Sequence, residues 1–248
     1  MLKALCGSVL IYSITSLLNV ANAEDPGKPT VTLPIKPFVA EYNILHKSDS
    51  VGKGIRQLKY LEDGNFEFSY NTQINWLIFS DTREEASTVS FDGKKLIPLQ
   101  YVFKREGTGS DKKEHWLYNI ENNHAINASK EKKLDYYLDL PDGIQDKLSY
   151  HLQHRINLIH NLQSKEFDYS VISNSGEVRN YAYSYDGTED VSLPYGVVKT
   201  VKFKRVKNKR TTIIWFAPEL NYLLVKLYQK KGSFEQFEAQ LMSVKESD

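Results

Sequence analysis

Residues 65–74, NFEFSYNTQI, alternate between two kinds of side chain. One face of an extended chain would carry Phe66, Phe68, Tyr70, Thr72 and Ile74. The intervening residues are polar, and this period of two is typical of an antiparallel strand with one buried face. The Asp63-Gly64 pair just before it is a strong hairpin-turn signal. The stretch therefore predicts one strand of an antiparallel sheet.

The same period recurs on both sides of this strand. Before it lies 38–44, FVAEYNI, and after it come 79–91, which runs to a second Asp-Gly pair, and 96–105, LIPLQYVFKR. Further alternating stretches separated by short turns occupy 166–244. About a dozen strands joined by tight turns imply an antiparallel meander, and a sheet of that size has to curl. The fold class is therefore mainly β.

The period changes at 144–163, IQDKLSYHLQHRINLIHNLQ. Apolar residues recur there every three or four positions, at Ile144, Leu148, Leu152, Ile156 and Ile159. That spacing predicts one amphipathic helix of about five turns, with Asp142 as its N-cap. His151 and His154 would be neighbours on this helix. Because no third metal ligand accompanies them, we expect them on a polar flank of the helix.

The N-terminus predicts export. Residues 1–23 contain a lysine, an apolar run and a final Ala-Asn-Ala, which is the pattern of a cleaved secretory signal peptide. The alternative is a retained membrane anchor, for which the run is barely long enough. Cleavage would remove the only cysteine, Cys6, and leave no transmembrane anchor. We expect a flexible lead-in at 24–35 and a single β-rich domain at 36–246.

Composition and motifs exclude several classes of protein. The net charge is +1, which argues against a dedicated nucleic-acid binder. The sequence has no G-x-S-x-G, P-loop, dinucleotide-binding or H-E-x-x-H motif. We therefore expect no cofactor, no metal and no catalytic residue, and we interpret the chain as a protein other than an enzyme.

The charged segment at 79–87, FSDTREEAS, is the first candidate site. The period of two places Asp81, Arg83 and Glu85 on one face, which later carries Val89 and Phe91. One interpretation is a ligand-binding mouth, with Arg83 held between two carboxylates and free to meet an anionic head group. The favoured interpretation is an ion-pair ladder on a solvent-facing strand.

The neighbouring strands supply apolar candidates for the same site. These ligand-binding candidates are Phe66, Phe68, Tyr70, Tyr101 and Phe103. A separate basic segment, 199–210, has the sequence KTVKFKRVKNKR. It has the charge to attract anionic lipid head groups, although we favour a solvated hairpin whose lysines deter pairing between sheet edges.

Two long segments resemble a known family. They are SDTREEASTVSFDGKKLIPLQYVFKREGTG at 80–109 and TTIIWFAPELNYLLVKLYQ at 211–229. They are similar to the domain of unknown function 3108 family of exported bacterial proteins. In the second segment the family usually has a proline where this chain has Leu224. The resemblance implies a large curved antiparallel sheet, a half-open barrel around one helix, with fold-level similarity to periplasmic lipoprotein carriers.

Two functions are consistent with these features. One helix is too small to cover every apolar strand face, which favours a periplasmic binder or carrier of an amphiphile such as a lipid, an acyl chain or a lipid-linked glycan. The alternative is an envelope interaction or assembly protein whose concave face is filled by its own side chains. A continuous apolar cavity would favour the carrier, and a solidly packed sheet would favour the assembly protein.

Overall fold

The computed structural model describes residues 32–129, 136–161, 163–173 and 175–247. These residues form fourteen strands, one α-helix and one 3₁₀ helix. The strands are β1 (Phe38–His46), β2 (Asp49–Tyr60), β3 (Phe66–Trp76), β4 (Phe79–Phe91), β5 (Leu96–Gly107), β6 (Lys112–Asn119), β7 (His124–Asn127), β8 (Tyr136–Leu138), β9 (Glu166–Ile172), β10 (Val178–Leu193), β11 (Gly196–Lys207), β12 (Arg210–Ala217), β13 (Leu223–Lys231) and β14 (Phe234–Glu246). The helices are α1 (Ser149–His160) and η1 (Pro218–Leu220).

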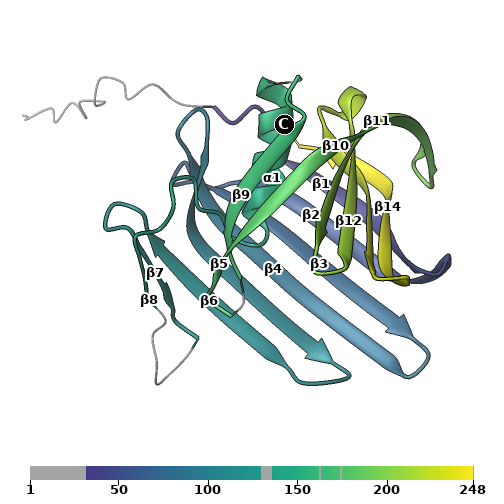
Figure 1. Ribbon diagram of the computed structural model, residues 1–248, viewed down its shortest axis with the longest axis horizontal. Coiled ribbons are helices and arrows are strands. Elements are labelled where there is room, and N and C mark those ends of the chain that lie inside the picture. The colour runs from purple at the N-terminus through teal and green to yellow at the C-terminus, as the bar shows by residue number, and fades with distance from the viewer. Residues whose placement is uncertain (1–31, 130–135, 162, 174, 248) are drawn as a thin grey trace, which may run out of the picture. The chain divides into compact units, whose positions relative to one another are not determined.

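All fourteen strands belong to one antiparallel sheet (Figure 1). Its order is β8-β7-β6-β5-β4-β3-β2-β1-β14-β13-β12-β11-β10-β9. Neighbours along the chain are neighbours in the sheet, and the first strand β1 pairs with the last strand β14. Strands β8 and β9 are its two edges, so the sheet is not closed into a barrel. The predicted fold class, a curved antiparallel sheet around one helix, is confirmed.

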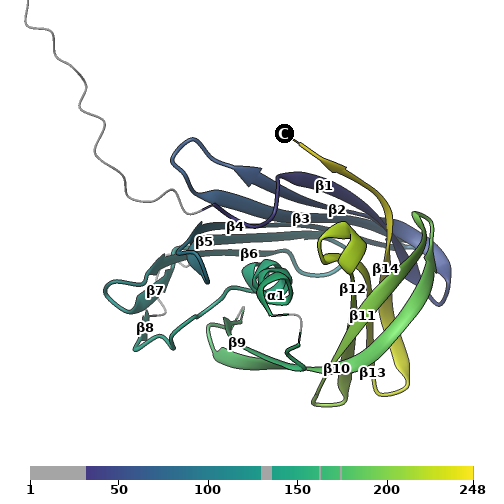
Figure 2. The same ribbon diagram turned by 90° about the horizontal axis from the view of Figure 1, so that it is seen from above.

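The sheet bends around α1, which lies on its concave face (Figure 2). In an antiparallel meander successive hairpin turns lie at alternate ends. The turns at 92–95 and 218–222 contact α1 through Gln153 and Arg155, and we call their end of the sheet the helix end. The turns at 47–48, 77–78, 108–111, 208–209 and 232–233 lie at the opposite end, which we call the open end.

The helix begins later than the sequence predicts. The carboxylate of Asp146 accepts hydrogen bonds from the backbone N–H groups of Leu148 (2.8 Å) and Ser149 (2.7 Å). The Ser149 hydroxyl accepts one from the N–H of Asp146 in return, which is a reciprocal capping arrangement. The prediction of Asp142 as N-cap is wrong, because that carboxylate pairs with Lys95 instead.

The helix is buried on nearly every side. Leu152, Ile156 and His154 are at most 1% exposed. The His154 ring lies 4.8 Å from the Phe216 ring and 4.6 Å from the Phe167 ring, measured between centroids. The expectation that His154 lies on a polar flank is therefore wrong, because aromatic side chains of β9 to β12 surround its ring. None of the helices in the described ranges is long and apolar enough to cross a membrane.

The core begins before the predicted domain boundary at residue 36. Leu33 is 3% exposed and Ile35 is 1% exposed, and the Tyr60 hydroxyl donates a hydrogen bond to the Ile35 carbonyl at 2.7 Å. The predicted flexible lead-in at 24–35 therefore ends too late, because these two apolar side chains pack into the core. Residues 24–31 and the predicted signal peptide at 1–23 lie outside the described residues.

Candidate functional site

The predicted charged trio occupies the concave face of β4, but its pairing differs from the prediction. Asp81 accepts hydrogen bonds from the Nε atoms of Arg83 (2.5 Å) and Arg105 (2.6 Å). The two arginines outweigh the effect of burial, which alone would raise the pKa of Asp81, and they hold this pKa below its usual value. One carboxylate thus lies between two arginines, so the less favoured interpretation, in which Arg83 lies between two carboxylates, is wrong.

Glu85 takes no part in this ion pair. It accepts a hydrogen bond from the Tyr101 hydroxyl at 3.1 Å. Burial, and then the Glu85 charge, raise the pKa of Tyr101 well above its ordinary value. The acidic side chain therefore orients a core tyrosine, and Arg83 remains half exposed at the edge of the cluster.

The aromatic candidates are packing residues in this structure. Phe66, Phe68, Tyr101 and Phe103 are each 6% exposed or less and belong to the main core. Tyr70 is partly buried, with the Arg56 guanidinium 4.7 Å from its ring centroid. Their assignment to the concave side is right, whereas a ligand-binding role for any of them stays a prediction.

A wide hollow lies on the other face of the sheet. It has a volume of about 770 Å³ and spans the outward-facing side chains of β2 to β5. Lys53, Lys59, Glu67, Glu84 and Lys104 contribute charges of both signs to it. This mixture is typical of a solvated strand face, so the hollow gives no sign of a particular ligand.

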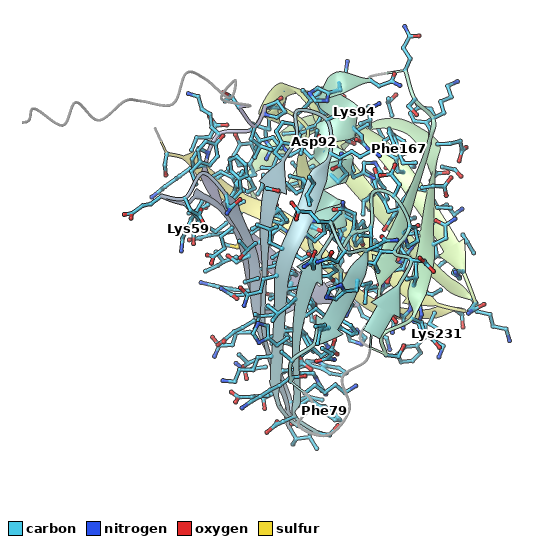
Figure 3. The ribbon with its side chains drawn as sticks, turned by 90° about the vertical axis from the view of Figure 1, so that its left-hand side faces the viewer. Lys59, Phe79, Asp92, Lys94, Phe167 and Lys231 are labelled. Atoms are coloured by element: carbon cyan, nitrogen blue, oxygen red, sulfur yellow. The ribbon has the colours of Figure 1, made fainter. Side chains whose placement is uncertain are left out.

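A second pocket is chemically more distinctive. It has a volume of about 480 Å³ and lies at the open end of strands β10 to β13. We call it the cationic pocket, and it is lined by Glu177, Arg179, Tyr181, Arg205, Lys207, Asn208, Arg210 and Lys231. Five of these side chains are cationic and one is acidic. Figure 3 shows Lys231 and Phe79 toward one end of the strands, and Asp92 and Lys94 toward the other.

Strand register brings the cations together. Lys207 is directly opposite Arg210, and Arg210 is directly opposite Lys231. The row nearer the core consists of Arg205, Thr212 and Gln229, and the next row consists of Phe203, Ile214 and Leu227. The concave face of these strands therefore passes from apolar to polar to cationic as it approaches the open end.

Aromatic rings hold the deepest cation in position. The Arg205 guanidinium lies 3.8 Å from the centroid of the Tyr181 ring and 5.4 Å from that of Tyr183. Burial opposes ionisation of Arg205, but the surrounding tyrosines raise its pKa overall. Tyr150 of α1 packs edge-on against Tyr181 at 5.1 Å, which connects the pocket to the helix.

The cations of the pocket have few acidic partners. Glu177 pairs with Arg179, with 2.7 Å between Oε2 and Nη2. Within the described part of the chain, neither Arg210 nor Lys231 forms an ion pair. Adjacent like charges repel each other unless an anion lies between them, so the pocket has the electrostatics of an anion-binding site.

Sequence reasoning detected only part of this pocket. The basic segment at 199–210 contains three of its cations, Arg205, Lys207 and Arg210. Arg179 and Lys231 come from other strands, and the register that brings them together was not predicted. The described residues contain no group of three His, Cys, Asp or Glu side chains arranged to hold a metal ion.

Comparisons with solved structures support the fold. A β-barrel-like protein of domain of unknown function DUF1849 from Brucella abortus aligns with a TM-score of 0.62 at 13% identity, covering 86% of this chain and 99% of that one. A DUF1089 family protein from Pseudomonas aeruginosa aligns with a TM-score of 0.39 at 13% identity, covering 73% and 91%. Only the first alignment is close enough to bear on the fold. No curated protein matches the chain in sequence.

The sequence comparison identifies the family. Residues 66–235 match the family described as protein of unknown function, DUF3108. The matched region extends from the start of β3 to the start of β14 and includes α1 and all four strands of the cationic pocket. The match extends over more than half of the chain, so this protein belongs to the DUF3108 family, as the sequence predicts.

Proposed function

We propose that this protein is a non-enzymatic binder of anionic amphiphiles, with the cationic pocket as the site for the anionic head group. The amphiphile is a lipid, an acyl chain or a lipid-linked glycan. The observation that carries this proposal is the row formed by Lys207, Arg210 and Lys231 on three adjacent strands. Like charges directly opposite each other destabilise a sheet, and a bound anion would relieve that repulsion.

The chemistry of the pocket suits a phosphate or carboxylate. Arginine presents a planar fork of donors that matches either group, and lysine adds a mobile point charge. Arg205 is already oriented by the Tyr181 ring, so its side chain loses little freedom on binding. An oriented arginine beside mobile lysines favours the binding of one specific anionic group over the loose attraction of many counterions.

A hollow of mixed apolar and polar lining lies toward the helix end of the same strands, and its apolar part supports the assignment of an amphiphile. Its volume is about 520 Å³, and Val201, Phe203, Tyr185 and Leu158 are among its lining residues. The side chains of Phe203 and Arg205 are on the same face of β11, two residues apart. The hollow and the pocket therefore share strand β11, with the buried ring of Phe203 between them.

The proposed location is the periplasm. The N-terminal sequence supports it, because a basic residue, an apolar run and small residues before position 24 have the pattern of a signal peptide. An exported protein meets lipids and lipid-linked intermediates in that compartment, which is consistent with binding an anionic amphiphile.

A second candidate function is an envelope interaction or assembly protein. The observation that favours it is the solid packing of the concave face around α1, where Leu152, His154 and Ile156 are buried against the strands. An interior filled by the protein's own side chains leaves no room there for an acyl chain. The carrier function therefore depends on the open end of the sheet.

Titration with a soluble anionic amphiphile tests the proposal. Wild-type protein should bind lysophosphatidylglycerol, below its micelle concentration, at least tenfold more tightly than lysophosphatidylcholine. The double variant R210Q/K231Q should lose that preference. The control is K204Q/K230Q, which removes two lysine charges from the other face of the same strands. Equal loss in both double variants would refute a specific pocket, because it would show that only net charge matters.

A further inference from the structure

The hairpin between β3 and β4 has an unusual turn. Trp76 is paired with Phe79, so Leu77 and Ile78 are the two central residues of the turn. Leu77 and Ile78 are each 86% exposed, and Phe79 is 52% exposed. Leu77 also has a φ of 54°, which is unfavourable for a residue with a branched side chain. Two large apolar side chains are therefore presented to solvent on a strained turn.

The other two-residue hairpins at the open end provide an internal comparison. Their central residues are Lys47-Ser48, Asn208-Lys209 and Gly232-Ser233. These are polar or glycine-containing pairs, as such turns prefer. Leu77-Ile78 departs from that chemistry in the same fold and at the same end. Residues that break the local turn preference and gain no packing from it are typical of functional positions, so we interpret Leu77 and Ile78 in this way.

Neighbouring turns hold this hairpin in place. The Thr108 hydroxyl accepts a hydrogen bond from the Ser80 N–H at 3.0 Å and donates one to the Ile78 carbonyl at 3.3 Å. On the other side, the His46 ring lies 4.7 Å from the Trp76 ring. The backbone of the turn is thus fixed while its apolar side chains point outward.

The apolar surface continues beyond the hairpin. Phe234, at the start of β14, is 63% exposed, and its ring lies 6.4 Å from that of His46. We call the apolar set the tip, and it consists of Trp76, Leu77, Ile78, Phe79 and Phe234. His46 bridges the tip's two parts.

Basic residues accompany the tip. The Lys47 ammonium is 5.2 Å from the centroid of the Phe234 ring, and Lys209 occupies the β11–β12 turn at the same end. Two acids lie beside Lys47: Asp49 ends the same turn, and the Glu235 carboxylate accepts a hydrogen bond from the backbone N–H of Lys47. The Lys47 ammonium forms no ion pair with either acid among the described residues, so it is available to external anions.

We propose that the tip docks on an anionic lipid bilayer, with Leu77, Ile78 and Phe79 inserted among the acyl chains. Trp76 would then lie at the level of the head groups, where tryptophan is enriched in membrane proteins. Lys47 and Lys209 would contact the anionic head groups around the inserted residues. Exposed apolar side chains with a basic surround are the chemistry of interfacial membrane binding.

A second copy of the chain fits this surface less well. A symmetric dimer brings the same patch of both subunits together. Lys47 would then face the tip and the basic turns of its partner, and like charges would meet around the apolar contact. A bilayer with anionic lipid has the complementary charge, so we assign the tip to a membrane surface. This inference goes beyond the proposed function, because it concerns none of the residues that line the cationic pocket.

Tryptophan fluorescence provides a direct test. The chain has three tryptophans, and Trp116 and Trp215 are 1% and 7% exposed, whereas Trp76 is 37% exposed. Vesicles containing phosphatidylglycerol should shift the emission of wild-type protein to shorter wavelength, and brominated lipids should quench it. The variant W76F should show neither change, because its remaining tryptophans are buried.

Three variants distinguish the effect of inserting Leu77 and Ile78 from the effect of the lysine charges and from the effect of any exposed apolar side chain. L77N/I78G introduces a favoured hairpin turn, so it should fold normally and bind these vesicles at least tenfold more weakly. K47Q/K209Q should reduce the dependence of binding on anionic lipid. V197S is the control, because Val197 is 70% exposed at the helix end, and it should bind as wild type does.

Three outcomes would overturn the proposal. The first is wild-type protein that fails to bind phosphatidylglycerol vesicles, and the second is L77N/I78G binding them as tightly as wild type. The third is a wild-type dimer, measured by analytical ultracentrifugation, that L77N/I78G converts to a monomer. That result would assign the tip to contact between two copies. L77N/I78G changes no residue of the cationic pocket, so it should keep the preference for lysophosphatidylglycerol while it loses vesicle binding, which distinguishes a failure of the tip from a failure of the pocket.

Discussion

The carboxylate of Asp146 accepts a hydrogen bond from the Ser87 hydroxyl at 2.5 Å, and neither residue is exposed. The same carboxylate accepts two backbone N–H bonds at the start of α1. One buried acid therefore joins the middle of β4 to the beginning of the helix. Burial raises the pKa of Asp146 to about 6, although these hydrogen bonds oppose that rise. At neutral pH the group is largely ionised and depends on its three donors.

Ser87→Ala should lower the free energy of unfolding by about 1.5–3 kcal/mol at pH 7.5, because it removes a donor from a buried charged acceptor. Urea melts followed by circular dichroism measure this change. Ser90→Ala on the outward face of the same strand is the control, and it should stay within about 0.5 kcal/mol of wild type. Equal values for the two variants would show that the Ser87 bond does not anchor the helix.

His154 should make the protein sensitive to acid. Burial lowers its pKa from 6.5 to about 3, and neither ring nitrogen has a hydrogen-bond partner among the described residues. The unfolded chain binds a proton near pH 6.5 and the folded protein only near pH 3. The stability is therefore complete above pH 6.5 and is lost as the pH falls toward 3, at no more than about 1.4 kcal/mol per pH unit.

His154→Phe should remove the part of that dependence that comes from His154, while His151, whose pKa burial also lowers well below its ordinary value, stays in both proteins. A phenyl ring fits the surrounding aromatic cluster without an unpaired polar atom, so the variant should gain stability over wild type as the pH falls from 6.5 to 4.5. Asp146 titrates in the same window with the opposite sign, since its raised pKa favours the folded state at low pH. It is present in both proteins, so its effect cancels in the difference. A constant difference between the two melts across this window would contradict the assignment.

Arg83→Ala should cost less than about 1 kcal/mol of stability, because the Arg83 side chain is 45% exposed and Asp81 keeps its bond to Arg105. Arg105→Ala should cost more, since the Arg105 side chain is only 22% exposed and also donates to the carbonyls of Thr108 and Ser110. Thermal melts of both variants provide the comparison. A larger loss of thermal stability for Arg83→Ala than for Arg105→Ala would contradict the conclusion that Arg105 is the main partner of Asp81.

The strands were predictable because a strand with one buried face alternates apolar and polar residues along the sequence. The alternation of Phe66 and Phe68 with polar neighbours identified both the strand and its buried face, and the structure confirms both. The helix was harder, because Ile144 and Leu148 have helical spacing while belonging to the loop that precedes α1. A buried loop and the buried face of a helix both contain apolar residues, so the spacing of those residues alone does not distinguish the two.

The cationic pocket was less predictable, and the reason is geometric. Lys207 and Arg210 flank one turn and are recognisable as a basic segment, whereas Lys231 lies on the next strand. Whether Lys231 points toward Arg210 depends on the register shift in the β12–β13 pair. A bulge of one residue reverses the face of every later side chain, and no short sequence pattern reports it.

Native mass spectrometry of protein purified without detergent tests the central claim most directly. Wild-type protein incubated with lysophosphatidylglycerol should carry one adduct of that mass, R210Q/K231Q should carry none, and K204Q/K230Q should match wild type. This result is expected because the cationic row at the open end holds the head group. Wild-type protein that remains free of the adduct, or adducts of equal intensity on wild type and R210Q/K231Q, would contradict the account.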